Sequence, residues 1–327
     1  MVGALTRRAR GTPRAMTIQW YPGHMTKARR LLVESIPSQD VIIEVLDARM
    51  PRASENPVVT ELRKQKPCIK VLSKSDLADP EVTRAWLRWF ESTERPGGKV
   101  RAIAITTERP GEAKAKIPAL CKALALHPSG IGKTVRAMVV GIPNVGKSTL
   151  INTLMERKVA KVGDEPAVTK GQQKVVLKNG MTLSDNPGIL WPKIEDEIGA
   201  LRLALGGAIP DAAIDYEVVA VFGGKFFLEH IPERLRARYK LDAVPATVDE
   251  LLREIGRRRG GLRSGGVVDM HKAADVLIHD FRSGALGRIS LEAPTDRPTA
   301  PTAPTAPTAP TAPTAPTDDL GDDLGDE

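Results

Sequence analysis

The fold is decided by the stretch GIPNVGKST at residues 141–149. It fits G-x-x-x-x-G-K-[ST], the pattern of the phosphate-binding P-loop. The apolar run RAMVV at 136–140 predicts a buried strand before it, and residues 148–155 predict a helix after it. In that order the loop N–H groups and the helix start face phosphate oxygens. The stretch therefore predicts a nucleoside triphosphatase, with Lys147 on the β- and γ-phosphates and the Ser148 hydroxyl on Mg²⁺.

Further phosphate-side signals lie within and after this loop. Asp185-Asn186-Pro187-Gly188 ends a predicted strand and matches D-x-x-G. Asp185 is expected to hold Mg²⁺ through water, and the Gly188 N–H to sense the γ-phosphate. Between the two motifs, Thr169 is the candidate switch threonine that closes over Mg²⁺, an assignment based on order and spacing. The remaining P-loop residues expected at the nucleotide are Pro143, Asn144, Val145, Gly146 and Thr149.

The base-reading signal lies upstream of the P-loop, and nothing after residue 188 fits N-K-x-D. A predicted strand at 68–72 leads into S-K-S-D, and a second predicted strand at 101–105 leads into a threonine pair. Asp76 can accept hydrogen bonds from guanine N1–H and N2–H₂, which adenine does not offer, and Lys74 can lie along the base. The expected base-contacting residues are Ser73, Lys74, Ser75, Asp76, Thr106 and Thr107. All parts of a guanine site are present, but their order along the chain is rotated.

Several other segments carry a resemblance to a known family. They are WYPGHM at 20–25, DARMP at 47–51, DNPGILWP at 185–192, DFRSG at 280–284 and LGRI at 286–289. Together with the rotated motif order, they resemble the circularly permuted GTPases of the bacterial ribosome biogenesis GTPase A family. The resemblance covers roughly residues 16–291. It implies GTP hydrolysis in the late assembly of the large ribosomal subunit precursor, with GTP/GDP and Mg²⁺ as ligands and ribosomal RNA as a partner.

Two positions depart from the pattern of that family. Ser73 stands where asparagine is usual, which we expect to weaken the bracing of the loop more than the reading of the base. Asn186 stands where threonine is usual in D-T-P-G.

The source of water activation is a separate question. Ile189 directly follows D-x-x-G, where many GTPases have a water-orienting glutamine, and isoleucine cannot hydrogen-bond water. The resemblance implies that His24 positions the water instead. The alternative is that His24 packs structurally in its Pro-Gly turn. Similarly, in related GTPases an asparagine at the place of Asn144 can ligate K⁺, and the alternative is an ordinary loop residue.

Composition sets limits on compartment and partner. The chain has 327 residues, 41% of them apolar, and no apolar run long enough to span a membrane. Two cysteines fit neither a disulfide framework nor a zinc site, which indicates a reducing, cytoplasmic compartment. Residues 291–327 carry one Arg and eight acidic residues, a net charge of −7. Because the whole chain has a net charge of +8, residues 1–290 carry +15. Such a basic body favours RNA as a partner over a membrane, although general solubility is the simpler explanation.

Shifts in pattern divide the chain into four expected segments. They are a basic arm at 1–15, a circularly permuted P-loop GTPase domain at 16–194, a small all-helical RNA-binding domain at 195–290, and a disordered Pro/Thr/Ala-rich and acidic tail at 291–327. Alternating short strands and helices in the second segment predict a doubly wound α/β sheet. The arm has four Arg and no acid, but it lacks the amphipathic stripe of a mitochondrial transit peptide.

The helical segment carries a cluster of arginines beside glycine pairs. Its predicted helices are 198–205, 211–227, 232–239, 247–256 and 268–283. The cluster consists of Arg253, Arg257, Arg258, Arg259 and Arg263. It suits phosphate contacts on folded RNA, although a run of charge is usually a solvated face.

The motifs favour a GTPase, expected to be a monomer, and the resemblance implies that it acts on the large ribosomal subunit precursor. Two alternatives stay open at this point. One is a nucleotide-gated RNA-binding scaffold with negligible turnover, which Ile189 would favour. The other is a tRNA-directed GTPase, although the cysteine or cofactor modules typical of that class are missing.

Overall fold

The computed structural model describes residues 23–92, 98–125, 134–155, 173–177, 179–186, 188–191, 194, 196–263 and 265–295. Thr169, the basic arm and the repeats of the tail lie outside these residues, as does the side chain of His24.

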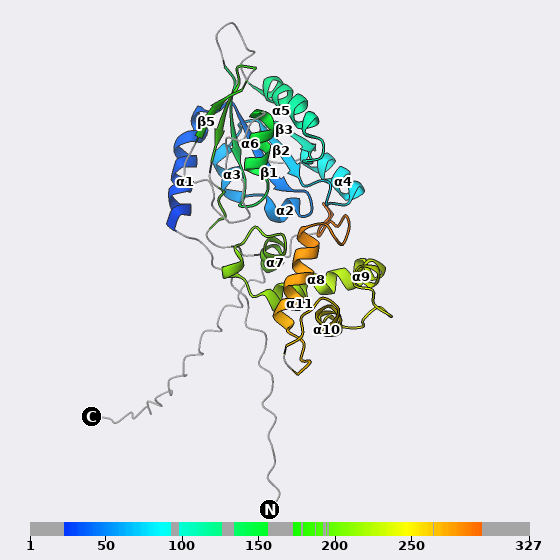
Figure 1. Cartoon of the computed structure of the whole chain (residues 1–327). Helices are drawn as coiled ribbons and strands as arrows, with labels where there is room; N and C mark the ends of the chain where they lie inside the picture. The colour runs from blue at the N-terminus through cyan, green and yellow to red at the C-terminus, as the bar shows by residue number, and fades with distance from the viewer. Residues whose placement is uncertain are drawn as a thin grey trace, which may run out of the picture.

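One mixed sheet forms the centre of the amino-terminal body (Figure 1). Its strands in chain order are β1 (Val41–Asp47), β2 (Cys68–Ser73), β3 (Val100–Ala104), β4 (Arg136–Val140), β5 (Gln173–Val176) and β6 (Thr182–Asp185). In space the order is β3-β2-β1-β4-β6-β5. Neighbours run parallel except β5 and β6, which pair antiparallel around the Asn179-Gly180 turn.

The two halves of the sheet meet between β1 and β4. Val41 pairs with Ala137 and Glu44 with Val140, so the P-loop strand lies beside the first strand of the chain. The chain winds outward from this junction in opposite directions, which makes it a topological switch point. This arrangement confirms the predicted circularly permuted, doubly wound sheet. Five neighbouring strands, β3, β2, β1, β4 and β6, run parallel, so their carboxyl ends lie at one edge of the sheet. Both sets of nucleotide motifs follow those ends.

Helices cover both faces of the sheet. The helices of this body are α1 (Gly23–Ser35) with η1 (Ile36–Ser38), α2 (Pro51–Ser54), α3 (Pro57–Arg63), α4 (Pro80–Glu91), α5 (Pro110–Leu124) and α6 (Lys147–Met155). Successive strand residues point to opposite faces. On β1, Ile43 and Val45 pack with α5 and α6, whereas Ile42 joins the cluster of α1 and α3 and Leu46 the cluster of α4.

The carboxyl-terminal body is helical, and it lies below the sheet in Figure 1. Its elements are α7 (Glu197–Leu205), η2 (Asp211–Ala213), α8 (Tyr216–His230), α9 (Pro232–Tyr239), α10 (Val248–Arg258) and α11 (Met270–Arg282). The predicted helix at 211–227 is divided because Asp215 caps a new helix: its carboxylate accepts from the N–H groups of Glu217 and Val218. Thr247 and Glu250 form a capping box that starts α10.

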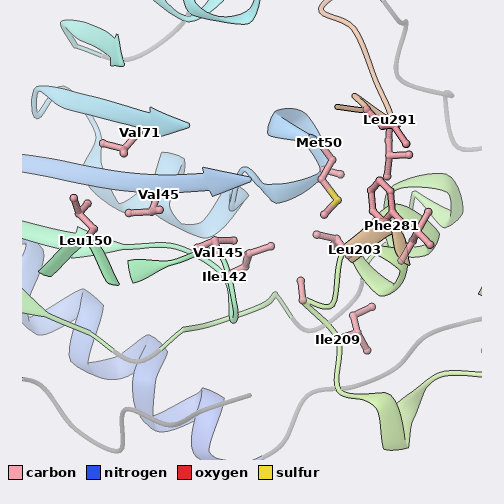
Figure 2. Close-up of a cluster of buried hydrophobic side chains, with 14 of the residues drawn as sticks. Val45, Met50, Val71, Ile142, Val145, Leu150, Leu203, Ile209, Phe281 and Leu291 are labelled. Atoms are coloured by element: carbon pink, nitrogen blue, oxygen red, sulfur yellow. The ribbon is translucent and has the colours of Figure 1, made fainter. Parts of the chain in front are cut away.

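The two bodies share one hydrophobic core. Figure 2 shows Met50 of the sheet body next to Leu203 of α7 and Phe281 of α11, with Val45 and Ile142 to the left of it. All five side chains belong to a single buried cluster. The helical body is therefore packed against the sheet edge at which the strands end.

The chain packs against the sheet body beyond residue 290, where we expected the tail to begin. Leu291 is 2% exposed, and its N–H donates to Arg49 O at 2.7 Å. Glu292 is 4% exposed; it accepts from the N–H of Arg52 and Ala53 at the start of α2 and pairs with Arg202 at 2.9 Å. These contacts return the chain from α11 to the sheet body.

Candidate nucleotide-binding site

The P-loop forms the predicted turn between β4 and α6. Gly141, Asn144 and Gly146 have φ values of 149°, 56° and 97°, so the loop needs left-handed backbone at several positions. Lys147 is the first residue of α6 and is 7% exposed. Its Nζ donates to Ile142 O at 2.7 Å, which folds the side chain back over the loop. Burial lowers the pKa of Lys147 to about 8, although Asp185 opposes the shift.

The D-x-x-G segment lies directly against this loop. A Cβ added at Gly188 would lie 2.9 Å from Pro143 Cα and 2.7 Å from Lys147 Nζ. Only glycine fits such a close approach. The next N–H, of Ile189, donates to Gly141 O at 3.3 Å. The structure thus brings together the P-loop and Gly188, as the sequence predicts.

The surroundings of Asp185 indicate whether a metal ion fits beside the P-loop. It ends β6 and is 2% exposed, and neither carboxylate oxygen has a hydrogen-bond partner among the described residues. Burial raises the pKa of Asp185 to about 6, although Lys147 opposes the shift. A buried carboxylate without partners is costly unless a ligand completes it. Oxygen donors of this kind suit Mg²⁺, and Ser148, at the start of α6, is the second donor named from the sequence. The amide of Asn186 is equally buried and unpartnered among the described residues.

The base end is built at the ends of β2 and β3. Ser75 N–H donates to Ile105 O at 3.2 Å, which ties the two base-side loops together. A cavity of about 250 Å³ lies there, and Asp76 and Thr106 are among its lining residues. Its rim includes Arg288 from the chain that follows α11. The structure therefore brings Ser75, Asp76 and Thr106 to one cavity, whereas Thr107 is exposed beside it.

Ser73 still braces the P-loop. The loss of bracing that we expected from serine in place of asparagine is therefore only partial. Its Oγ lies 2.9 Å from Leu46 O and also within hydrogen-bond reach of Val145 O in the P-loop. A hydroxyl has one proton, so it can donate to only one of the two carbonyls at a time. The serine still links the base-reading strand to the phosphate loop.

Asp47 has a central role that was not predicted from the sequence. Lys74 Nζ donates to Asp47 Oδ2 at 2.9 Å, and Arg49 pairs with the same oxygen at 2.8 Å. Although burial opposes it, these two cations hold the pKa of Asp47 well below its usual range. The signal was available: Asp47 ends β1, at the same sheet edge as the other motifs. Its carboxylate fixes Lys74, whose φ of 55° already constrains the base-side loop.

The carboxyl end of α7 receives side chains from the nucleotide site. Arg49 Nη2 donates to Gly206 O at 3.4 Å, and Asn144 Nδ2 in the P-loop donates to Gly207 O at 2.9 Å. Arg282 of α11 donates to Ala204 O at 2.9 Å and to Leu205 O at 3.1 Å. Four successive carbonyls at this helix end are thus held from the sheet body and from α11. Positive donors suit the negative end of a helix dipole.

Comparison with known proteins agrees with this geometry. Residues 136–215 match the family described as "50S ribosome-binding GTPase". Over 288 residues the chain is 42% identical to Ribosome biogenesis GTPase A of Bacillus cereus, which covers 86% of this chain and 95% of that protein. This chain belongs to the ribosome biogenesis GTPase A family. Membership makes it a guanine nucleotide-binding GTP hydrolase, as the motifs predict.

Solved structures of the family share the fold. The GDP-bound YlqF structure from Thermotoga maritima is 28% identical, with a TM-score of 0.59, and covers 82% of this chain and all of that one. The GNP-bound YlqF structure from the same organism has a TM-score of 0.58 at 29% identity, over 83% of this chain and 100% of that one. Among the described residues, no helix is long and apolar enough to cross a membrane.

Proposed function

We propose that this chain hydrolyses GTP while bound to the large ribosomal subunit precursor, and that it promotes late assembly of that particle in the cytoplasm. The observation that carries the proposal is the meeting of β1 and β4, which places the base-reading and phosphate-binding motifs at one sheet edge. The relative from Bacillus cereus is named for ribosome biogenesis. The large subunit, and action as a monomer, are parts of our proposal.

The phosphate end has the groups that the reaction requires. Asp185 and Ser148 would hold Mg²⁺, and Thr169 would join them when the triphosphate is bound. The metal ion would neutralise charge on the β- and γ-phosphates. Lys147 releases Ile142 O and binds the same phosphates, and the Gly188 N–H binds the γ-phosphate. Asp76 selects guanine, with Lys74 held along the base by Asp47.

Ile189 takes no part in activating water. It is 2% exposed and belongs to the buried cluster that contains Leu32 of α1. The histidine at position 24 lies at the start of this same helix. We assign to His24 the role of accepting a hydrogen bond from the attacking water.

The helical segment, residues 195–290, is the proposed RNA-binding surface. Most of its arginine cluster is paired in this structure: Arg253 with Asp249, Arg257 and Arg258 with Glu254, and Arg263 with Asp269. All of these arginines are exposed, and solvent screens such surface pairs, so phosphate groups can replace the carboxylates. Arg259 instead packs over the Tyr239 ring and donates to Arg238 O.

Nucleotide state would reach this surface through the end of α7. Arg49 and Asn144 connect the base loop and the P-loop to Gly206 and Gly207. A nucleotide-dependent shift of either loop would move α7, so RNA affinity should differ between the GTP- and GDP-bound forms. Equal affinities in a filter-binding assay would refute this coupling.

K⁺ binding by Asn144 is a further part of the proposal, tested by comparing turnover in KCl and NaCl.

Single-turnover hydrolysis, measured with and without large ribosomal subunits, tests the function. We expect GTP but not ATP to compete for the site, and subunits to accelerate hydrolysis. His24→Ala should retain nucleotide affinity and lose the acceleration. If turnover stays negligible with subunits present while RNA binding still depends on nucleotide, the alternative of a nucleotide-gated scaffold is correct; the burial of Ile189 is the observation that favours it.

A further inference from the structure

Asn56, between α2 and α3, is a buried residue whose backbone N–H and two side-chain polar atoms all form hydrogen bonds. It is 0% exposed. Its Oδ1 accepts from Val58 N–H at 3.0 Å and so caps α3. Its backbone N–H donates to Glu44 Oε1 at 2.9 Å. Its Nδ2 donates to Ile189 O at 2.9 Å, across 133 residues of chain. Capping explains the oxygen of this amide but not the nitrogen.

The bond from Asn56 completes a two-sided attachment of Ile189. The N–H of Ile189 is held by Gly141 O, at the end of the P-loop strand, and its carbonyl is held by Asn56. The isoleucine side chain is buried in the cluster with Val140 and Leu32. Ile189 therefore has its backbone and side chain fixed, immediately after the glycine of D-x-x-G.

Gly188 has little freedom beside this attachment. It lies against Pro143 and Lys147 so closely that an added Cβ would collide with both. The attachment of Ile189 and the close approach to the P-loop together limit the orientations open to the Gly188 N–H. Preorganised donors of this kind stabilise developing charge without having to reorganise.

Asn56 itself rests on a buried network of charges. Glu44 accepts from Asn56 N–H through one oxygen and from Lys70 Nζ through the other, at 2.5 Å. Lys70 also pairs with Glu55, at 2.7 Å, which is the residue before Asn56. The network anchors the Asn56 backbone to β1 and β2. The side-chain amide of Asn56 is therefore held in a fixed orientation.

We propose that Asn56 is a positioning residue for triphosphate recognition: it holds the Ile189 carbonyl so that the Gly188 N–H faces the terminal phosphate. This inference rests on the proposed function. Asn56 does not touch the nucleotide, and it acts through the main chain of the D-x-x-G segment. Its effect should therefore be confined to nucleotides that have a γ-phosphate.

The test compares two affinities in the full chain, for GDP and for a non-hydrolysable GTP analogue, both with Mg²⁺. Asn56→Ser retains a hydroxyl that can cap α3 but loses the donor to Ile189. We expect the affinity for the analogue to fall about tenfold, the value of one net hydrogen bond, while the affinity for GDP changes less than twofold. Asp79→Ser, at the cap of α4, is the matched control and should change neither affinity.

A second variant keeps the test decisive if the serine protein folds poorly. Asn56→Thr also retains a hydroxyl that can cap α3 and fills more of the space left by the amide, but it lacks the amide donor to the Ile189 carbonyl, so the same selective loss is expected. Equal weakening of both ligands in the folded variants, or no weakening of the analogue, would overturn the inference. If the unmodified chain bound neither nucleotide, the proposed function itself would fail, which is a distinguishable result.

Discussion

Two lysines are buried in the sheet body, and they differ in what surrounds the charge. Lys70 on β2 has a fully buried side chain and pairs with Glu44 at 2.5 Å and Glu55 at 2.7 Å. Lys147 in the P-loop is nearly as buried, but its Nζ bonds to a neutral carbonyl, Ile142 O. Burial disfavours both charges. The carboxylates nevertheless hold the pKa of Lys70 above its usual value, whereas the pKa of Lys147 falls to about 8.

The difference separates the charge of Lys70, which stabilises the fold, from the charge of Lys147, which is suited to bind a ligand. The environment of Lys70 is complete, and its partner Glu44 is also its register partner across β1 and β2. Lys147 and Asp185 form an incomplete pair, in which the carboxylate has no hydrogen-bond partner among the described residues. Perturbed groups of this second kind concentrate at functional sites. The comparison therefore predicts opposite responses to substitution.

The largest effect is expected at Lys70. Lys70→Ala leaves Glu44 and Glu55 as buried carboxylates without their cation, which should lower the free energy of unfolding by about 3–5 kcal/mol. Urea denaturation followed by circular dichroism measures the change. Lys116→Ala, at an exposed lysine of α5, is the control and should shift stability by less than about 0.5 kcal/mol. A cost at Lys70 no larger than that of the control would mean that its ion pairs do not hold the fold.

Lys147→Ala should have the reverse profile. We expect GTP and GDP affinity to fall at least about 100-fold, equivalent to about 2.7 kcal/mol, because the main cation for the phosphates is lost. The nucleotide-free protein should be as stable as the unmodified chain, since the variant removes a buried charge that burial disfavours. Calorimetric titration and urea denaturation measure the two quantities. A large loss of stability would place Lys147 in the same class as Lys70.

Much of this site could be predicted from the sequence because its motifs are local. The P-loop, D-x-x-G and S-K-S-D each need only a strand and the turn that follows it, and apolar runs identify those strands. The rotated order of these motifs also predicted a circularly permuted domain, which the strand order confirms. The helix at 211–227 was predicted as continuous because Asp215, its dividing cap, occurs within an otherwise helical pattern.

The long-range partners could not be predicted in the same way. Glu44 lies in the apolar run VIIEVL, and only the register of β1 against β2 places it opposite Lys70. The bonds from Asn144 to Gly207 and from Asn56 to Ile189 join residues 63 and 133 positions apart. The first of these bonds depends on how the helical body docks against the sheet edge, and the second on how the segment after β6 packs beside α3. No local pattern encodes either arrangement.

A third prediction uses pH to expose the unpartnered carboxylate of Asp185. The pKa of Asp185 in the folded chain is about 6, above its ordinary value of 3.8, so the folded state favours the protonated carboxyl. The stability that results is present below pH 3.8 and is lost as the pH rises through 6. Asp185→Asn cannot ionise. Without nucleotide or metal, this variant should exceed the unmodified chain in stability by about 1–2 kcal/mol at pH 7, and the advantage should vanish toward pH 4. Urea denaturation across this range measures the difference, and a difference independent of pH would contradict the assignment.

The smallest effect is expected at Glu55, the outer partner of Lys70. Its side chain is 15% exposed, whereas that of Glu44 is fully buried and also accepts from Asn56 N–H. Glu55→Gln keeps an oxygen that can accept from Lys70 and removes only a charge that solvent partly screens, so it should cost about 1 kcal/mol. Glu44→Gln, the matched variant, should cost clearly more in the same urea denaturation. Equal costs would mean that Lys70 depends on both carboxylates alike, and that burial of the partner does not set the strength of the pair.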